Sequence, residues 1–234
     1  MIFKINEQKN NLVEAEKATT IAGFTRMVAH DIRRPLNLIK MLLDIDKESP
    51  ENSIPGDFKN SVESAINNAK SMLDDIRSYN SEIILKREVV DPKHLLESSL
   101  SNLESFYSAK NITIEKYYNH SRNISVDPNK MQRVFTNIID NAFEAIGEGS
   151  GKIIIETSDE KNGFTCSIKN TGSFIPEHEL TKIFEPGFSS KQKSGRGLGL
   201  MIAKKFVEVH NGAVRCISDE KESFTLFEVS IYES

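Results

Sequence analysis

The sequence predicts two parts of different fold class. Residues 1–87 form an α-helical hairpin that pairs into a dimeric four-helix bundle, and residues 88–234 form an α+β sandwich in which helices cover a mixed sheet. Three observations support this division. Apolar residues recur at steps of three and four through the first part. A turn over residues 48–57, with two prolines and a glycine, interrupts that pattern. The second part mixes strand-like and helix-like segments without a regular βαβ alternation.

Each helix of the first part carries a continuous apolar face. In the first helix the face runs from Ile21 to Leu43, and in the second the mean step is about 3.5 residues, which is typical of left-handed supercoiling. The apolar positions of the second helix are Phe58, Val62, Ala65, Ala69, Met72, Ile76, Tyr79 and Ile83. A single hairpin would leave these faces in water, so we expect two copies of the chain to pair into a four-helix bundle.

The second part begins with residues 89–92, a linker or a first short strand. An amphipathic helix follows near residues 93–108, and an alternating strand over 112–118. Asp127 and Pro128 are typical of an N-cap and a first helical position, and predict a helix to about Ile146, where glycines end it. Further on, the sequence predicts strands over 153–157 and 164–169, a helix over 198–210, and strands over 213–218 and 224–232.

Composition and charge exclude several functions. The 234 residues include 30 Lys and Arg against 34 Asp and Glu, a net charge of −4, which is the wrong balance for a nucleic-acid partner. No apolar run reaches the length that spans a bilayer, and the N-terminus does not read as a signal peptide. Cys166 and Cys216 lie in strand-like segments and predict buried reduced thiols rather than a disulfide. We therefore expect a cytoplasmic chain with no membrane segment.

His30 is the first candidate for chemistry. Asp31, next to it, can hold the proton of one ring nitrogen and leave the other nitrogen as a nucleophile. Pro35 lies about one turn further along. A proline inside a helix costs about 3 kcal/mol, which suggests that the bend it makes beside His30 has a function. The alternative interpretation is a solvent-exposed histidine with no function.

Asn137 and Asn141 form a second candidate site, because they lie four residues apart on one face of the predicted helix. Two amide oxygens in this arrangement suit a Mg²⁺ ion that already carries phosphates and waters. For two asparagines alone, an ordinary polar helix face is the competing explanation.

Glycine-rich segments form the third candidate. Residues 170–176 include Gly172, and Gly195, Gly197 and Gly199 lead into a helix start, where backbone N–H groups can receive phosphate oxygens. Neither the Rossmann spacing nor the P-loop spacing is present. Lys191 lies between the two glycine clusters, in a segment whose composition predicts a mobile lid.

Five motifs in this order resemble those of the bacterial sensor histidine kinases, over roughly residues 15–232. They are His30-Asp31-Ile32-Arg33-Arg34-Pro35-Leu36, the helix with Asn137 and Asn141, Asn170-x-Gly172, Phe184-Glu185-Pro186, and Gly195-x-Gly197-x-Gly199-Leu200. They correspond to the H, N, G1, F and G2 boxes of that family.

The resemblance implies a dimerisation and histidine-phosphotransfer hairpin over 1–87 and an ATP-binding catalytic domain of the gyrase-like ATPase superfamily over 88–234. His30 would be the phosphoacceptor and Asp31 the base that activates it. The phosphoryl group would come from ATP, with Mg²⁺, and pass to an aspartate of a response regulator. The chain would then be either a stand-alone kinase or the cytoplasmic core of a longer membrane-attached sensor.

The resemblance also implies roles at the nucleotide. Asn141 would be the principal Mg²⁺ ligand, with Asn137 assisting. Asn170, beside Gly172, would accept a hydrogen bond from the adenine amino group. The remaining nucleotide-binding residues would be Lys191, Gly195, Gly197, Leu198 and Gly199, which would hold the phosphates.

Three residues depart from the family pattern. Asn170 stands where an aspartate is usual, and its amide oxygen can still accept, though without charge. Phe174 replaces the second glycine of the G1 box, and Arg34 occupies a position where many relatives have Thr or Asn. These departures keep open a second hypothesis, a catalytically degenerate dimeric nucleotide-binding scaffold. A third, another gyrase-like ATPase, is less consistent with the His-Asp-x-x-x-Pro segment.

Overall fold

The computed structural model describes residues 66, 83–107, 111–147, 149–185, 188 and 198–233. The predicted helical hairpin lies almost entirely outside these residues, and so do His30 and Asp31. The fold below is therefore that of the second part alone.

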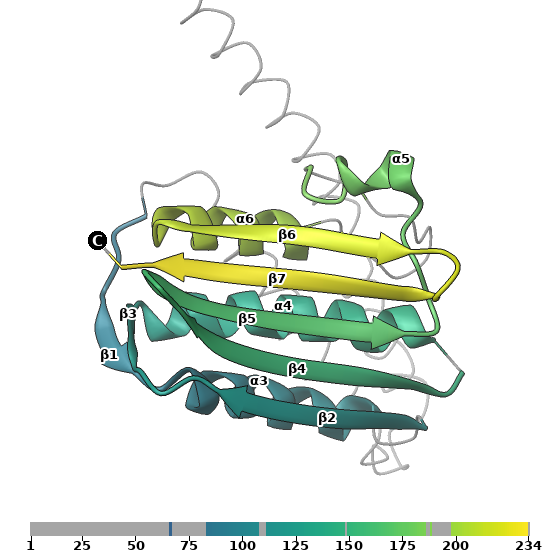
Figure 1. Ribbon diagram of the computed structural model, residues 1–234, viewed down its shortest axis with the longest axis horizontal. Helices are drawn as coiled ribbons and strands as arrows, with labels where there is room; N and C mark the ends of the chain where they lie inside the picture. Colours follow the sequence, from purple (N-terminus) through teal and green to yellow (C-terminus); the bar gives the residue numbers. More distant parts are fainter. Residues whose placement is uncertain are drawn as a thin grey trace, which may run out of the picture. The chain divides into compact units, whose positions relative to one another are not determined.

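Strands and helices mix along this part of the chain (Figure 1). In order they are β1 (Glu88–Val90), α3 (Pro92–Tyr107), β2 (Ile112–Asn119), β3 (Ile124–Val126), α4 (Pro128–Ile146), β4 (Gly151–Glu160), β5 (Gly163–Thr171), α5 (Glu177–Leu180), α6 (Gly199–Val209), β6 (Gly212–Asp219) and β7 (Phe224–Tyr232).

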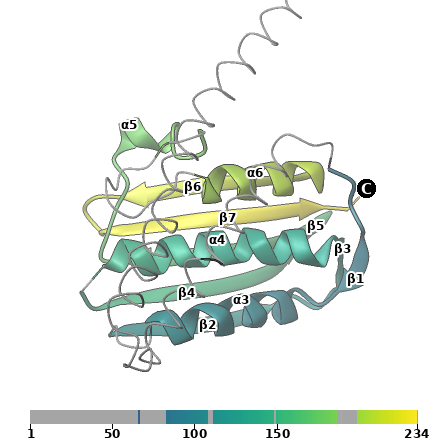
Figure 2. The same cartoon turned by 180° about the vertical axis from the view of Figure 1, so that it is seen from behind.

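Five strands form one mixed sheet in the order β2-β4-β5-β7-β6. The β2–β4 pair is parallel, and the other neighbours are antiparallel. Strands β1 and β3 form a separate two-stranded antiparallel ladder. Figures 1 and 2 show α3, α4 and α6 together on one face of the large sheet. The predicted α+β architecture, with helices on one side of a mixed sheet, is confirmed for this part of the chain.

The core lies between the sheet and the helices. In β4, Ile153, Ile155 and Thr157 are buried, while residues between them are partly or fully exposed, which is the period-2 pattern of a half-buried strand. Helix α4 lies between α3 and α6 (Figure 2) and turns its apolar face to the sheet. Its buried residues are Met131, Val134, Phe135, Ile138, Ile139, Ala142, Phe143 and Ile146.

Helix α4 begins and ends where the sequence predicts. Asp127 is the N-cap, with its side chain accepting from the backbone N–H of Lys130 at 3.2 Å, and Pro128 opens the helix. At the other end Gly147 has φ 67°, a conformation that costs glycine little and other residues more. Both boundaries follow from local sequence signals.

The structure differs from the sequence prediction in the lengths of some strands and in two short elements. Strands β4 and β5 extend beyond the predicted 153–157 and 164–169, because the backbone ladder continues past both ends of the apolar segments. The sequence did not predict β3 or α5. Strand β3 has three residues and depends on pairing with β1, far away in the sequence, and α5 has four residues and buries none of them.

Both cysteines are free thiols, as predicted, but Cys216 is only half-buried. Cys166 is fully buried, and burial raises the pKa of its thiol. Burial also raises the pKa of Cys216, to about 12. Neither is poised to act as a thiolate.

Among the described residues, no helix has both the length and the apolar character needed to cross a bilayer.

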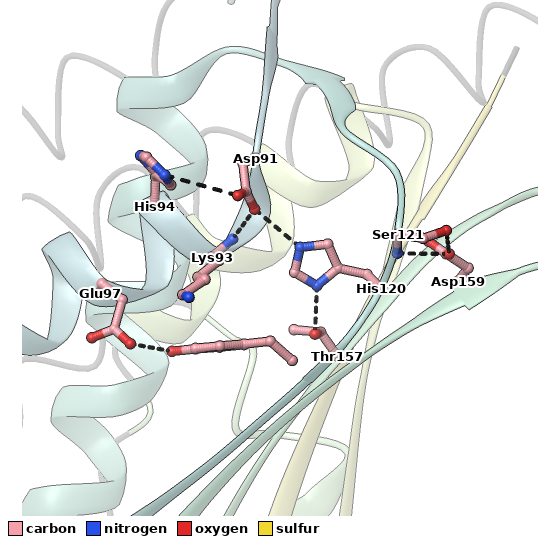
Figure 3. A network of polar contacts seen from close by, with 9 residues as sticks. Asp91, Lys93, His94, Glu97, His120, Ser121, Thr157 and Asp159 are labelled. Carbon is pink, nitrogen blue, oxygen red and sulfur yellow. Dashed lines mark hydrogen bonds and ion pairs between the residues drawn. The ribbon is translucent and has the colours of Figure 1, made fainter.

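A chain of three polar side chains ties the start of α3 to the sheet (Figure 3). The carboxylate of Asp91 can only accept, so the Nε2–H of His120 donates to it, at 3.0 Å. His120 Nδ1 then accepts from the hydroxyl of Thr157 at 2.7 Å. The hydrogen bond from His120 lowers the pKa of Asp91. Thr157 is buried in the core, so this chain of hydrogen bonds positions the start of α3 on the sheet.

A second set of polar contacts, further along α3, also ties this helix to the sheet. Glu97 accepts hydrogen bonds from the Tyr118 hydroxyl at 3.0 Å and from Lys116 Nζ at 2.9 Å. Burial raises the pKa of Tyr118, and the hydrogen bond to Glu97 raises it further. Strand β2, at the edge of the sheet, is thereby fixed to the helix that covers it.

Candidate functional site

Asn137 joins α4 to the beginning of α6. Its Nδ2 donates to the backbone carbonyl of Gly199 at 3.0 Å, which leaves Oδ1 as the ligand atom of the side chain. The contact is close, because a Cβ at Gly199 would lie 3.4 Å from Cγ of Asn137. The predicted metal-ligand helix and the predicted phosphate-binding turn therefore meet at this point.

Asn141 lies one turn beyond Asn137 on the same face of α4, and both side chains are half-buried. Their amide oxygens are hard, neutral ligands of the kind that Mg²⁺ accepts when phosphates and waters supply the other positions. The described residues hold no group of three His, Cys, Asp or Glu side chains that could bind a metal without such help. The donor set thus fits an ion that arrives with a phosphate ligand.

The first turn of α6 (Gly199–Val209) offers backbone N–H groups that have no partner within the helix itself. Leu198 is its N-cap and makes no side-chain capping bond, and Gly199 opens the helix. The orphan N–H groups of a helix start, together with the helix dipole, favour an anion such as a phosphate. Lys191, Gly195 and Gly197, the other predicted phosphate-binding residues, lie outside the described residues.

Asn170 lies near the end of β5 and is 1% exposed. It is on the same side of the sheet as the buried Cys166 and Ile168, and hence on the side that the helices cover. Its Nδ2 donates to Ser173 Oγ at 2.9 Å, which leaves Oδ1 as the acceptor. Gly172, between them, turns the chain with φ 84°, and its N–H donates to the carbonyl of Ser223 at 2.8 Å.

Hydroxyl groups that the sequence analysis missed surround Asn170. Thr225 pairs with Asn170 across β5 and β7, and its Oγ1 lies 3.4 Å from the Ser173 carbonyl and 3.2 Å from Ser218 Oγ. Ser218 accepts from the N–H of Ile175 at 2.8 Å and donates to the Phe224 carbonyl at 2.9 Å. Nothing in the local sequence marks these residues, because strand pairing alone brings them to Asn170.

Phe184, of the predicted F box, packs against the domain. Its ring contacts that of Phe227 edge to face, with centroids 6.4 Å apart, and Lys204 Nζ of α6 lies 5.7 Å from its centroid. Phe174, which replaces a family glycine, is 39% exposed. The segment after β5 is therefore attached to the sheet through Phe184, whereas Phe174 is partly exposed to solvent.

Comparison with known proteins identifies the domain. Residues 126–233 match the family described as histidine kinase-, DNA gyrase B-, and HSP90-like ATPase. Sporulation kinase B of Bacillus subtilis is 27% identical over 222 residues, covering 93% of this chain and 51% of the relative. Sporulation kinase A of the same organism is 30% identical over 97% of this chain and 37% of its own length. Sensor histidine kinase ZraS of Escherichia coli is 28% identical over 94% of this chain and 48% of its own length.

Solved structures agree on the fold. The catalytic domain of histidine kinase ThkA is 28% identical, with a TM-score of 0.58 over 63% of this chain and 96% of that domain. ThkA in complex with the response regulator TrrA is 24% identical, with a TM-score of 0.68 over 97% of this chain and 66% of that chain, which shows the fold alone. This chain spans about half the length, or less, of the curated relatives named above. Residues 126–233 thus carry a domain of the histidine kinase-, DNA gyrase B-, and HSP90-like ATPase type, and the chain as a whole is similar to bacterial sensor histidine kinases.

Proposed function

We propose that this chain is an ATP-dependent protein-histidine autokinase that phosphorylates His30 and donates the phosphoryl group to an aspartate of a response regulator. The observation that carries the proposal is the 3.0 Å hydrogen bond between Asn137 and Gly199. It joins the face of α4 that suits Mg²⁺ to the helix start that suits phosphates, within an ATPase fold. The named relatives are histidine kinases, which supports the same reaction here.

The base and the phosphates of ATP bind at different elements in this proposal. Asn170 Oδ1 accepts from the adenine amino group, and the turn at Gly172 lets the backbone come close to the base. The α6 start, with Leu198 and Gly199, receives the phosphates through the N–H groups of its first turn. Lys191, Gly195 and Gly197 precede α6 in the sequence and bind the phosphates as well in this proposal, although they lie outside the described residues.

Asn141 is the principal Mg²⁺ ligand, and Asn137 assists through Oδ1, which its bond to Gly199 leaves available. When bound, Mg²⁺ neutralises charge on the phosphate oxygens. The amide groups contribute orientation without adding negative charge beside the triphosphate.

His30 is the nucleophile. Asp31 holds the proton on one ring nitrogen, and the other nitrogen attacks the γ-phosphorus. A nitrogen–phosphorus bond forms, the bond from the γ-phosphorus to the bridging oxygen breaks, and ADP leaves. The phosphoryl group then passes to a carboxylate oxygen of the regulator. ThkA, a structural neighbour, has been solved with a response regulator bound, which supports a partner of this class.

The same proposal divides the chain into a dimerisation and phosphotransfer hairpin over 1–87 and a catalytic domain over 88–234. The homodimer forms through the hairpin, because its apolar faces need a partner. We place the reaction in the cytoplasm, where ATP and reduced thiols are both available.

Incubation with ATP labelled at the γ-phosphate tests the proposal. We expect wild-type protein to take up label that is acid-labile and base-stable, as a nitrogen–phosphorus bond requires, and His30→Ala to take up none. His94→Ala is the matched control, because the His94 side chain is 83% exposed on α3 and should retain full labelling.

Each other result excludes a hypothesis. Full labelling of His30→Ala would assign the phosphoryl group to another residue. If the protein binds ATP but neither takes up label nor releases phosphate, the result would favour the degenerate scaffold. Release of free phosphate alone would favour another ATPase of the gyrase-like superfamily.

A further inference from the structure

We propose that the base site at Asn170 accepts 6-oxopurine nucleotides as well as ATP. This inference rests on the proposed function, because it takes Asn170 as the residue that faces the edge of the base. It goes beyond that function in naming a second class of nucleotide. The choice of base depends on which groups near Asn170 can both donate and accept a hydrogen bond.

The Asn170 side chain has two possible orientations with the same shape. In one, Nδ2 donates to Ser173 Oγ, the contact seen at 2.9 Å, and the carbonyl oxygen is left to accept from a ligand. In the other, the Ser173 hydroxyl donates to the amide oxygen, and the NH₂ group is left to donate to a ligand. A serine hydroxyl serves either orientation, because it can donate or accept after rotation about one bond. Ser173 therefore leaves both orientations of the amide available.

The neighbouring polar groups do not oppose this exchange. Ser218 is held by the Ile175 N–H and the Phe224 carbonyl, so it does not compete for the amide. Thr225 can direct its one proton to the Ser173 carbonyl or to Ser218. The side chains in these described contacts are an amide and hydroxyls, with no carboxylate among them. A carboxylate there would accept only and would fix the direction of every hydrogen bond.

The two kinds of purine present opposite patterns at this edge. Adenine has an amino donor at C6 and an acceptor at N1, whereas a 6-oxopurine has a carbonyl acceptor at C6 and a donor at N1. One amide orientation matches the first pattern and the other matches the second. A site of fixed direction rejects the mismatched ligand strongly, because a buried polar group is left unpaired. The Asn170 site avoids that penalty by turning the amide.

Nucleotide affinity provides the test. The Mg²⁺ complexes of ATP and ITP are titrated calorimetrically into the whole chain. ITP has the carbonyl at C6 but no amino group at C2, so it differs from ATP only at the edge of the base that Asn170 faces. We expect the Kd of ITP to lie within about tenfold of that of ATP in the wild type. Asn170→Asp should raise the ratio of the ITP Kd to the ATP Kd by at least about tenfold, because the carboxylate cannot donate to the C6 carbonyl.

Asn162→Asp is the matched control. It makes the same change of charge at the opposite end of β5, at an exposed position in the turn before the strand, and should leave the ratio at the wild-type value. A wild-type ratio above about tenfold, or a ratio that Asn170→Asp does not change, would overturn the inference while ATP binding and His30 labelling stand. Binding of neither nucleotide would overturn the proposed function together with it.

Discussion

The imidazole of His210 accepts a hydrogen bond at Nε2 from the backbone N–H of Asp127, at 2.9 Å. Its Nδ1–H donates to the carbonyl of Phe206 at 2.6 Å, so both ring nitrogens are engaged and the ring is neutral. His210 is fully buried at the end of α6, and Asp127 caps the start of α4. One side chain thus joins the two helices that carry the proposed nucleotide site.

This contact makes the stability of the domain depend on pH. Burial lowers the pKa of His210 below its ordinary value of 6.5. Well above pH 6.5 the ring is neutral in both the folded and the unfolded chain and contributes no pH dependence. Below pH 6.5 the unfolded chain binds the proton first, so the free energy of unfolding falls until the lowered pKa of the native state is reached. Urea unfolding at several values between pH 5 and 8 measures this slope.

His210→Gln is the matched variant, because its amide can still accept from the Asp127 N–H but does not titrate. It should show a shallower slope between pH 5 and 6.5 than the wild type. Equal slopes in the two proteins would mean that another group carries the pH dependence.

Asp127→Ala should destabilise the domain by about 2 kcal/mol or more, since an N-cap alone is worth about 0.5–2 kcal/mol. Asp127 also accepts from the backbone N–H of Lys86 at 3.0 Å and from Lys130 Nζ at 2.7 Å. Burial raises the pKa of this carboxyl, but the hydrogen bonds from Lys130 and Lys86 outweigh burial and lower it. Thermal unfolding measures the loss. Asp159→Ala, which removes a carboxylate that accepts from Ser121 nearer the surface, should cost clearly less.

Asn141→Asp should lower the initial rate of autophosphorylation by at least about tenfold, in line with changes around metal sites. The carboxylate adds negative charge where the triphosphate and Mg²⁺ already lie close together in our proposal. Uptake of γ-labelled phosphate measures the rate. Asn119→Asp makes the same change at an exposed position at the end of β2 and should keep the wild-type rate. A normal rate in Asn141→Asp would place the Mg²⁺ ligands elsewhere.

The predicted dimer should dissociate when Ala69 and Met72 are both replaced by Glu. Unpaired charges buried between apolar helices cost several kcal/mol. Sedimentation equilibrium at micromolar concentration should show a dimer for the wild type and a monomer for the double variant. Replacing Asn60 and Asn67 with Glu adds the same charge at outward heptad positions and should leave the dimer intact. A monomeric wild type would refute the four-helix bundle.

Local signals account for the parts of the fold that the sequence predicted. Asp127, Pro128 and Gly147 define α4 through interactions within a few residues, and strands β6 and β7 follow Asn211 and Gly212 in the same way. Strand β3 escaped prediction because it exists only through its pairing with β1. The pairing of distant strands cannot be read from the composition of either one.

The residues of the candidate site also divide into those that local motifs predict and those that only strand pairing brings together. Asn137, Asn141 and Asn170 stand in recognisable motifs, and the structure gives Asn137 and Asn170 specific partners. Ser173, Ser218 and Thr225 carry no motif, and they reach Asn170 through a turn and the β5–β7 register. His210 has no sequence neighbour that would suggest its bond to Asp127, 83 residues away.

The strand order also implies a sequence of assembly. Strands β4 and β5 are neighbours in the chain, and so are β6 and β7, so each hairpin can form locally. Joining β5 to β7 requires closure of a long loop through α5 and α6, which makes this the slower step. Asn170 belongs to one hairpin, while Ser218 and Thr225 belong to the other. In this order of assembly the proposed base site is complete only after β5 and β7 have paired, and a nucleotide that binds there would stabilise the paired sheet over either hairpin alone.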